Sequence, residues 1–83
     1  LTVYPNPMSN QSTIAYSFPN DQSIRIGLYD ITGLILKELV NGNQVAGQHT
    51  NNLTNEHLSD GIYFIKLGSG NTMPVTQKII LIK

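Results

Sequence analysis

The stretch Leu58-Ser-Asp-Gly-Ile-Tyr-Phe-Ile-Lys-Leu67 carries the clearest structural signal in the chain. From Gly61 onward its side chains alternate between two faces, with Tyr63, Ile65 and Leu67 on one of them. A period of two is typical of a β-strand. The glycine lies directly before the alternation, where a turn with positive φ is easiest to form. We therefore predict a central strand from this stretch.

The same stretch also has the spacing of a tyrosine corner, which Leu58, Gly61 and Tyr63 would form. In such a corner, a tyrosine near the start of a sandwich strand donates a hydrogen bond to backbone a few residues upstream. We expect the hydroxyl of Tyr63 to reach backbone near Leu58 or Asn55. The alternative is an ordinary strand that begins after a glycine turn. Both interpretations make the element structural, without chemistry of its own.

The rest of the chain repeats this alternation between turn residues. The segment 34–40 contains residues that favour helix, but it follows Asp-x-x-Gly, so a hairpin strand is the better interpretation. No stretch keeps a helical period of 3.6. We predict an all-β, Ig-like antiparallel β-sandwich of about seven short strands. The further strands are expected at Leu1–Tyr4, Ser12–Phe18, Ser23–Tyr29, Leu34–Val40, Gln48–Leu53 and Val75–Lys83.

Turn residues mark the expected boundaries between these strands. Pro5-Asn6-Pro7 lacks two backbone donors and has two fixed φ angles, so we expect a rigid bend or a sheet edge there. Asp30 and Gly33 suit the first and last positions of a type I turn. Further turns are expected at Pro19-Asn20-Asp21, at Asn41-Gly42-Asn43 and at Gly68-Ser69-Gly70-Asn71.

Composition restricts the function of the chain. Its 83 residues suit one small domain, and the formal net charge of zero, without a basic patch, argues against nucleic acid as a partner. The longest apolar run is too short for a transmembrane segment. There is no cysteine, hence neither a disulfide nor a thiolate metal site. The chain begins directly with strand-like residues, so we expect residues 1–83 to be a single domain cut from a longer secreted protein.

A search for catalytic or metal-binding patterns favours a protein that is not an enzyme. Most carboxylates lie at expected turns, where they bond local backbone. His49 and His57 do not have the spacing of a metal-ligand pair. Neither a nucleophile elbow nor a phosphate-binding loop occurs. We therefore expect neither cofactor nor metal.

Four motifs together, in order along the whole chain, resemble the C-terminal sorting domain of proteins exported by the bacterial type IX secretion system (type A). Between the second and third of them, Ala46-Gly47-Gln48-His49 resembles a further family segment. One departure is Leu34, where the family often has lysine or another polar residue. The motifs are Val3-Tyr4-Pro5-Asn6-Pro7, Leu28-Tyr29-Asp30-Ile31-Thr32-Gly33, Leu58-Ser-Asp-Gly61-Ile-Tyr63-Phe64 and Gln77-Lys78-Ile79-Ile80-Leu81-Ile82-Lys83.

This resemblance implies a non-catalytic secretion signal that directs an N-terminal cargo domain of the same chain. The cargo would pass through the periplasm, where the outer-membrane translocon recognises the folded signal. A sortase-like protease would then remove the domain at the cell surface, by cleavage before Leu1. The cargo would remain at the surface or be secreted.

The last strand is the expected contact with the translocon, because it has apolar residues on both faces. Burial of both faces would explain the pattern. The alternative is that one face packs in the sandwich, while the other face and a free edge are offered to the translocon. The recognition residues implied by the resemblance are Lys78, Ile79, Ile80, Leu81, Ile82 and Lys83; the structural motif residues are Pro5, Asn6, Pro7, Tyr29, Asp30, Gly33, Leu58, Gly61 and Tyr63.

Two other functions remain possible from the residues alone. One is a carbohydrate-binding or adhesive module of fibronectin-like type, and the other is a structural accessory domain of a secreted enzyme. A glycan-binding module usually exposes clustered aromatic side chains, whereas the tyrosines here are separated along the chain.

Overall fold

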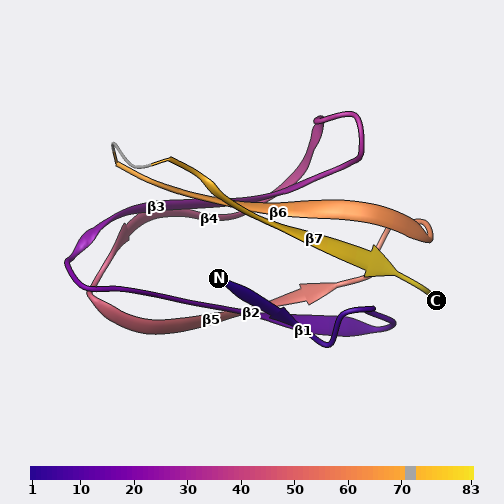
Figure 1. Cartoon of the computed structure of the whole chain (residues 1–83), viewed down its shortest axis with the longest axis horizontal. Helices are drawn as coiled ribbons and strands as arrows, with labels where there is room; N and C mark the ends of the chain where they lie inside the picture. The colour runs from indigo at the N-terminus through magenta and orange to yellow at the C-terminus, as the bar shows by residue number, and fades with distance from the viewer. Residues whose placement is uncertain (71–72) are drawn as a thin grey trace.

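The computed structural model of the chain describes residues 1–70 and 73–83, and these residues form seven strands and no helix (Figure 1). All strand pairs are antiparallel, and the strands make two sheets, with orders β1-β2-β5 and β4-β3-β6-β7. The predicted all-β fold class is confirmed. The strands are β1 (Thr2–Tyr4), β2 (Gln11–Phe18), β3 (Gln22–Tyr29), β4 (Ile35–Gln44), β5 (Gly47–Thr54), β6 (Gly61–Ser69) and β7 (Val75–Leu81).

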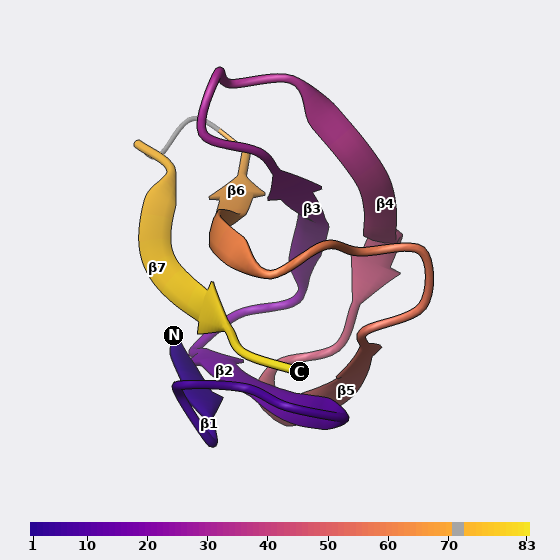
Figure 2. The ribbon, with the colours of Figure 1, turned by 90° about the vertical axis from the view of Figure 1, so that its right-hand side faces the viewer.

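The two sheets face each other as the layers of a sandwich (Figure 2). The chain crosses between them three times, after β2, after β4 and after β5. This Greek-key path, with β3 and β6 in the centre of the larger sheet, is the Ig-like arrangement that the sequence predicts. The loops after β1, β3 and β5 and the end of β7 all lie at one end of the sandwich (right in Figure 1).

The core follows the alternation of each strand. Ile65 of the central strand β6 is fully buried, and its neighbours Tyr63 and Leu67 on the same face pack against the core. Strands β2 and β3 likewise bury every second residue, as predicted. Burial of such large apolar side chains is the main favourable term in folding. The buried cluster comprises Val3, Met8, Ile14, Tyr16, Phe18, Ile24, Ile26, Leu28, Leu53, Ile65, Ile79 and Leu81.

The predicted loop at Asn41-Gly42-Asn43 is wrong. These residues lie inside β4, where Asn41 pairs with Arg25 and Asn43 with Ser23. Pairing with the long strand β3 overrides the local turn preference of Asn-Gly. The chain instead leaves β4 at residues 45–46, where Asp21 accepts a hydrogen bond from the Ala46 amide (2.7 Å).

The turn after β6 begins later in the chain than predicted. Gly68 and Ser69 belong to β6, so the strand continues two residues past Leu67. Gly70 follows the strand with a positive φ of 49°. Asn71, which was also expected in this turn, lies outside the described residues.

Candidate recognition site

Strand β7 packs by one face only. Ile79 and Leu81 are each 1% exposed and belong to the core, whereas Lys78 and Ile82 are exposed and Ile80 is half-buried. The interpretation of a strand buried on both faces is therefore wrong. The outward side chains of β7 lie on the outer face of the larger sheet, which a sandwich does not need for its core.

The edge of β7 is not free along its second half, contrary to expectation. The segment Pro5–Met8 runs beside it and supplies four hydrogen bonds. The Asn6 side chain donates to the Lys78 carbonyl (2.9 Å) and accepts from the Ile80 amide (3.0 Å). The backbone of Met8 accepts from the Ile82 amide and donates to the Ile80 carbonyl, both at 2.8 Å. The Asn6 side chain and the Met8 backbone thus make the hydrogen bonds that a neighbouring strand would otherwise make.

This edge segment is itself held by the rest of the sandwich. Met8 is 1% exposed and forms a parallel bridge with Leu81. The buried Ser12 hydroxyl donates to the Pro5 carbonyl (2.6 Å). The prediction of a bend or a sheet edge at Pro5-Asn6-Pro7 is confirmed, because the segment bends along the edge of a strand from the opposite end of the chain.

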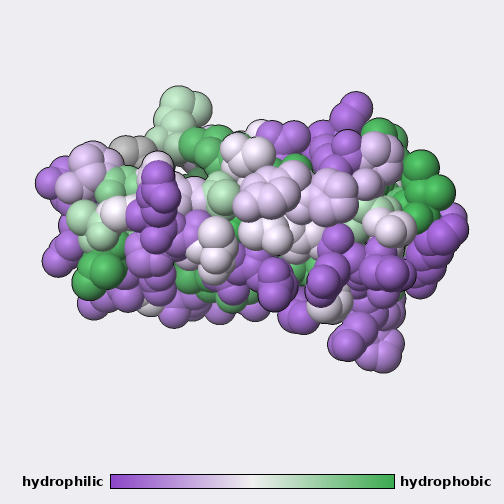
Figure 3. Space-filling model, turned by 90° about the horizontal axis from the view of Figure 1, so that it is seen from below, coloured by the Kyte–Doolittle hydropathy of each residue, from purple (hydrophilic) through white to green (hydrophobic). Residues whose placement is uncertain are grey.

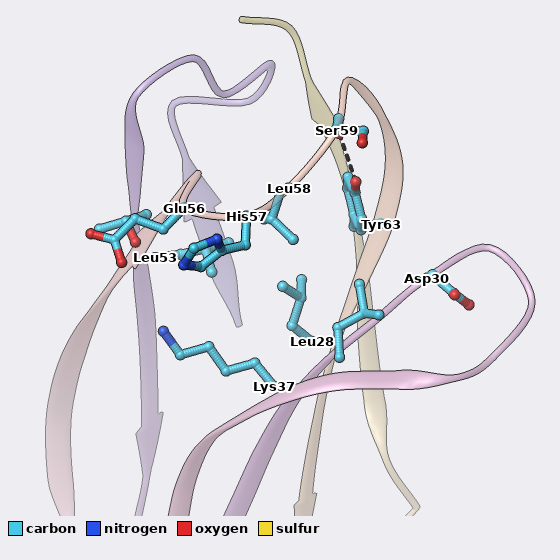
Figure 4. Close-up of a pocket in the computed structure, with 11 residues that line it drawn as sticks. Leu28, Asp30, Lys37, Leu53, Glu56, His57, Leu58, Ser59 and Tyr63 are labelled. Atoms are coloured by element: carbon cyan, nitrogen blue, oxygen red, sulfur yellow. Dashed lines mark hydrogen bonds between the residues drawn. The ribbon is translucent and has the colours of Figure 1, made fainter.

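The tyrosine corner is confirmed. The Tyr63 hydroxyl donates to the Ser59 carbonyl at 2.6 Å, one residue beyond the expected Leu58 (Figure 4). This bond joins β6 to the last part of the loop between β5 and β6. The corner lies close to the end of the chain, since Gly61 pairs with Leu81 and the Asp60 carboxylate accepts from the Lys83 amide (3.0 Å).

The Asp30–Gly33 turn is also confirmed. The Asp30 carboxylate accepts hydrogen bonds from the Thr32 amide (2.8 Å), the Thr32 hydroxyl (2.6 Å) and the Leu34 amide (3.0 Å). These donors, the Thr32 hydroxyl first, hold the pKa of Asp30 below its ordinary value of 3.8, although loss of hydration acts in the opposite direction. Gly33 has a φ of 91°, which a residue with a Cβ rarely adopts.

Tyr29 lies on the outer face of the larger sheet, beside Phe64 in the ladder of β3 and β6. Its ring covers Gly27, where a Cβ would be 2.9 Å from the ring, so this close approach requires glycine. The Lys66 amino group lies 4.7 Å from the ring centroid, a cation–π distance. These residues and the Asp30–Gly33 turn surround a shallow hollow of about 320 Å³.

A second, larger cavity of about 480 Å³ opens between the sheets beside the loop from β5 to β6 (Figure 4). Leu28, Leu53 and Leu58 supply apolar walls, while Glu56 and His57 stand at its rim. Among the described residues, no group of three or more His, Asp or Glu side chains could hold a metal ion. The cavity therefore has a mixed apolar and polar lining, and no such group of side chains occurs in the described part of the chain.

The structure brings the motif residues together at one end of the sandwich. Pro5, Asn6 and Pro7 lie along β7, and Leu58, Gly61 and Tyr63 form the corner beside its end. The turn at Asp30 and Gly33 lies at the same end (Figure 1), whereas residues 46–49 lie at the other end.

Four residues that shape this end were not among the site residues predicted from the sequence. Met8 and Asp60 bind the last strand and the residue Lys83 through pairings between the two ends of the chain. Phe64 and Lys66 were assigned only to a strand face, and their closeness to Tyr29 depends on the register of β3 with β6. Such pairings have no local signal in the sequence.

In the described part of the chain, no helix is long and apolar enough to cross a membrane.

Comparison with protein families gives one match that spans nearly the whole chain. The family model described as the secretion system C-terminal sorting domain matches residues 2–83. Neither the curated proteins nor the solved structures contain a match to the chain.

Proposed function

Because the chain belongs to the family of secretion system C-terminal sorting domains, the type IX sorting signals, we propose that the outer-membrane translocon recognises its C-terminal strand. In this proposal, the translocon binds residues Lys78–Lys83 while the domain is folded and its cargo is in the periplasm. A sortase-like protease then removes the domain, and the cargo stays at the cell surface or is released. The domain is the substrate of that step and supplies no catalytic group.

The observation that carries this proposal is the family match along residues 2–83, combined with the geometry of β7. The strand has its inward face in the core and its outward side chains available to a partner. Strand β7 is hydrogen-bonded to β6 on one side and to Asn6 and Met8 on the other. Its outward side chains are therefore held in fixed positions relative to one another. A folded signal of this kind presents side chains that are far apart in an unfolded chain.

A reporter fusion tests the proposal. A stable reporter enzyme with an inner-membrane export signal is joined to the complete chain and expressed in a bacterium that has a type IX system. We expect the reporter at the cell surface or in the medium, and in the periplasm when the 83 residues are removed. Equal surface amounts with and without the domain would contradict the proposed function.

Removal of the domain by the protease is tested separately in the same cells. The reporter recovered from the surface should have lost the mass of the sorting domain, and a host that lacks the protease should retain it. Full-length reporter on the surface of normal cells would contradict removal, although it would leave recognition by the translocon intact.

A further inference from the structure

The outer face of β6 and β7 combines exposed isoleucines with lysines that have no carboxylate partner among the described residues. From this combination we infer that this face, rather than the edge of β7, docks a protein surface that is apolar at its centre and acidic at its margin. The inference rests on the proposed function and specifies its partner. It extends the contact from the last six residues to Ile62, Phe64 and Lys66 of the preceding strand.

The apolar part of the surface comes from a cross-strand pair. Ile62 of β6 lies opposite Ile80 of β7. The Ile62 side chain is 40% exposed. Ile82 follows directly after β7 and is 54% exposed. Half-buried Phe64 continues the apolar surface towards the hollow beside Tyr29. Exposed apolar side chains that lie next to one another are typical of a docking surface.

The positive part flanks these side chains. Lys78 lies directly opposite Phe64 in the ladder, and Lys66 lies two residue pairs further along, over the Tyr29 ring. In the described part of the chain, the ion pair between side chains joins Arg25 and Glu38 (3.3 Å) and involves neither lysine. The two lysines are therefore available to carboxylates of a partner.

The hydrogen bonds along the edge of β7 favour docking on the outer face over addition of a partner strand to that edge. A partner strand along this half of the edge would need the Lys78 carbonyl, both backbone groups of Ile80 and the Ile82 amide, and these are bonded to Asn6 and Met8. The outward side chains of the same residues remain accessible. Contact through the face leaves the four edge hydrogen bonds intact and keeps the sandwich closed.

The charge also decides between kinds of partner. A second copy of the chain docked through the same face would bring its own Lys66 and Lys78 and no carboxylate for these lysines, so their charges would remain unpaired. A lipid surface usually attracts a cluster of about four to eight basic residues, more than this face carries. An acidic protein surface satisfies both the lysines and the isoleucines.

The experiment uses the reporter fusion with the complete chain. The variant Lys66→Gln with Lys78→Gln removes both charges, and the control Gln48→Glu with Thr50→Glu changes two exposed residues on the other sheet. Both double variants lower the formal net charge from zero by the same amount. We expect about tenfold less reporter at the surface for the lysine variant and wild-type export for the control.

Conservative and apolar variants extend the test. Lys66→Arg with Lys78→Arg should keep wild-type export, because the charge remains. Ile62→Asp should reduce export about tenfold, whereas the matched change Thr50→Asp should not. All variants should melt close to the wild-type temperature, since these side chains lie outside the core.

The outcomes separate the inference from the proposed function. Wild-type export of the lysine variant, or an equal loss in the control, would overturn the inference while the domain is still required. Surface reporter without any domain would overturn the proposed function itself. Sedimentation of the chain with phosphatidylglycerol vesicles, lost in the lysine variant, would assign the face to a membrane and overturn the protein partner.

Discussion

The two outer faces of the sandwich differ in chemistry although both cover the same core. The outward side chains of β1, β2 and β5, all within the described part of the chain, include no charged residue, and Figure 3 shows a largely hydrophilic surface. The outward side chains of β3, β6 and β7 include Tyr29, Ile62, Lys66 and Lys78.

This difference separates the requirements of folding from those of recognition. A sandwich needs one apolar face of each sheet, and either outer face could be polar without loss of the core. The smaller sheet has such a face. The larger sheet keeps apolar and basic residues where folding does not require them, so we attribute them to recognition.

The inner face of β7 should dominate stability. Leu81→Ala removes a side chain that is 1% exposed and should lower the free energy of unfolding by about 2–5 kcal/mol. Ile82→Ala, on the outer face of the larger sheet, should change it by less than about 0.5 kcal/mol. Thermal melting measures both variants. A similar loss in the two would show that the outer face also belongs to the core.

The Asp30–Gly33 turn supports the hollow on the larger sheet and should tolerate little change. Gly33→Val places a β-branched residue at a φ of 91°, which should cost about 1–3 kcal/mol of stability. Gly68→Ala is the control, because its added Cβ meets no atom within 4 Å. Chemical unfolding compares them. If Gly33→Val unfolds like the wild type, the turn does not need glycine.

The edge segment should hold the recognition face in place. Asn6→Ala removes two hydrogen bonds to β7 and should cost about 1–2 kcal/mol, since each contributes a modest net amount. Hydrogen exchange of the Ile80 amide should become faster. Asn52→Ala, on the outer face of the smaller sheet, should leave this exchange unchanged. Unaltered protection of Ile80 in the Asn6 variant would mean that the edge is held by Met8 alone.

The tyrosine corner should contribute a smaller amount. Tyr63→Phe removes the hydrogen bond to the Ser59 carbonyl and should cost about 1 kcal/mol. Tyr4→Phe changes a tyrosine that is 50% exposed on the smaller sheet and serves as the control. Equal melting temperatures of the two variants would remove the corner from the account of stability.

The ionisation of Asp30 should make a minor contribution to stability, and this contribution should depend on pH. The folded pKa of Asp30 lies below the unfolded value, so its carboxylate stabilises the turn above the ordinary value of 3.8. This contribution is lost as the pH falls through the lowered pKa. The difference in stability between wild type and Asp30→Asn should therefore be present near pH 7 and shrink as the pH falls below 3.8. A difference that grows on acidification would contradict the direction of the pKa shift.

The amino-acid sequence by itself determined the local elements of this protein. Alternation predicted the strands around Ile26 and Ile65, because a strand with one buried face shows a period of two in its own residues. The Asp30–Gly33 turn and the Tyr63 corner were predictable for the same reason. In each, the residues that bond one another lie within about four positions in the chain.

Only the tertiary structure decided which distant residues meet. The Asn41–Asn43 segment is a strand because β3 pairs with it, although Asn-Gly favours a turn locally. The Asn6 side chain occupies the edge of a strand more than seventy residues away, and Lys66 lies over Tyr29 because of the register of β3 with β6. The free energy of such contacts depends on pairing between strands, and no short stretch of the chain contains both partners.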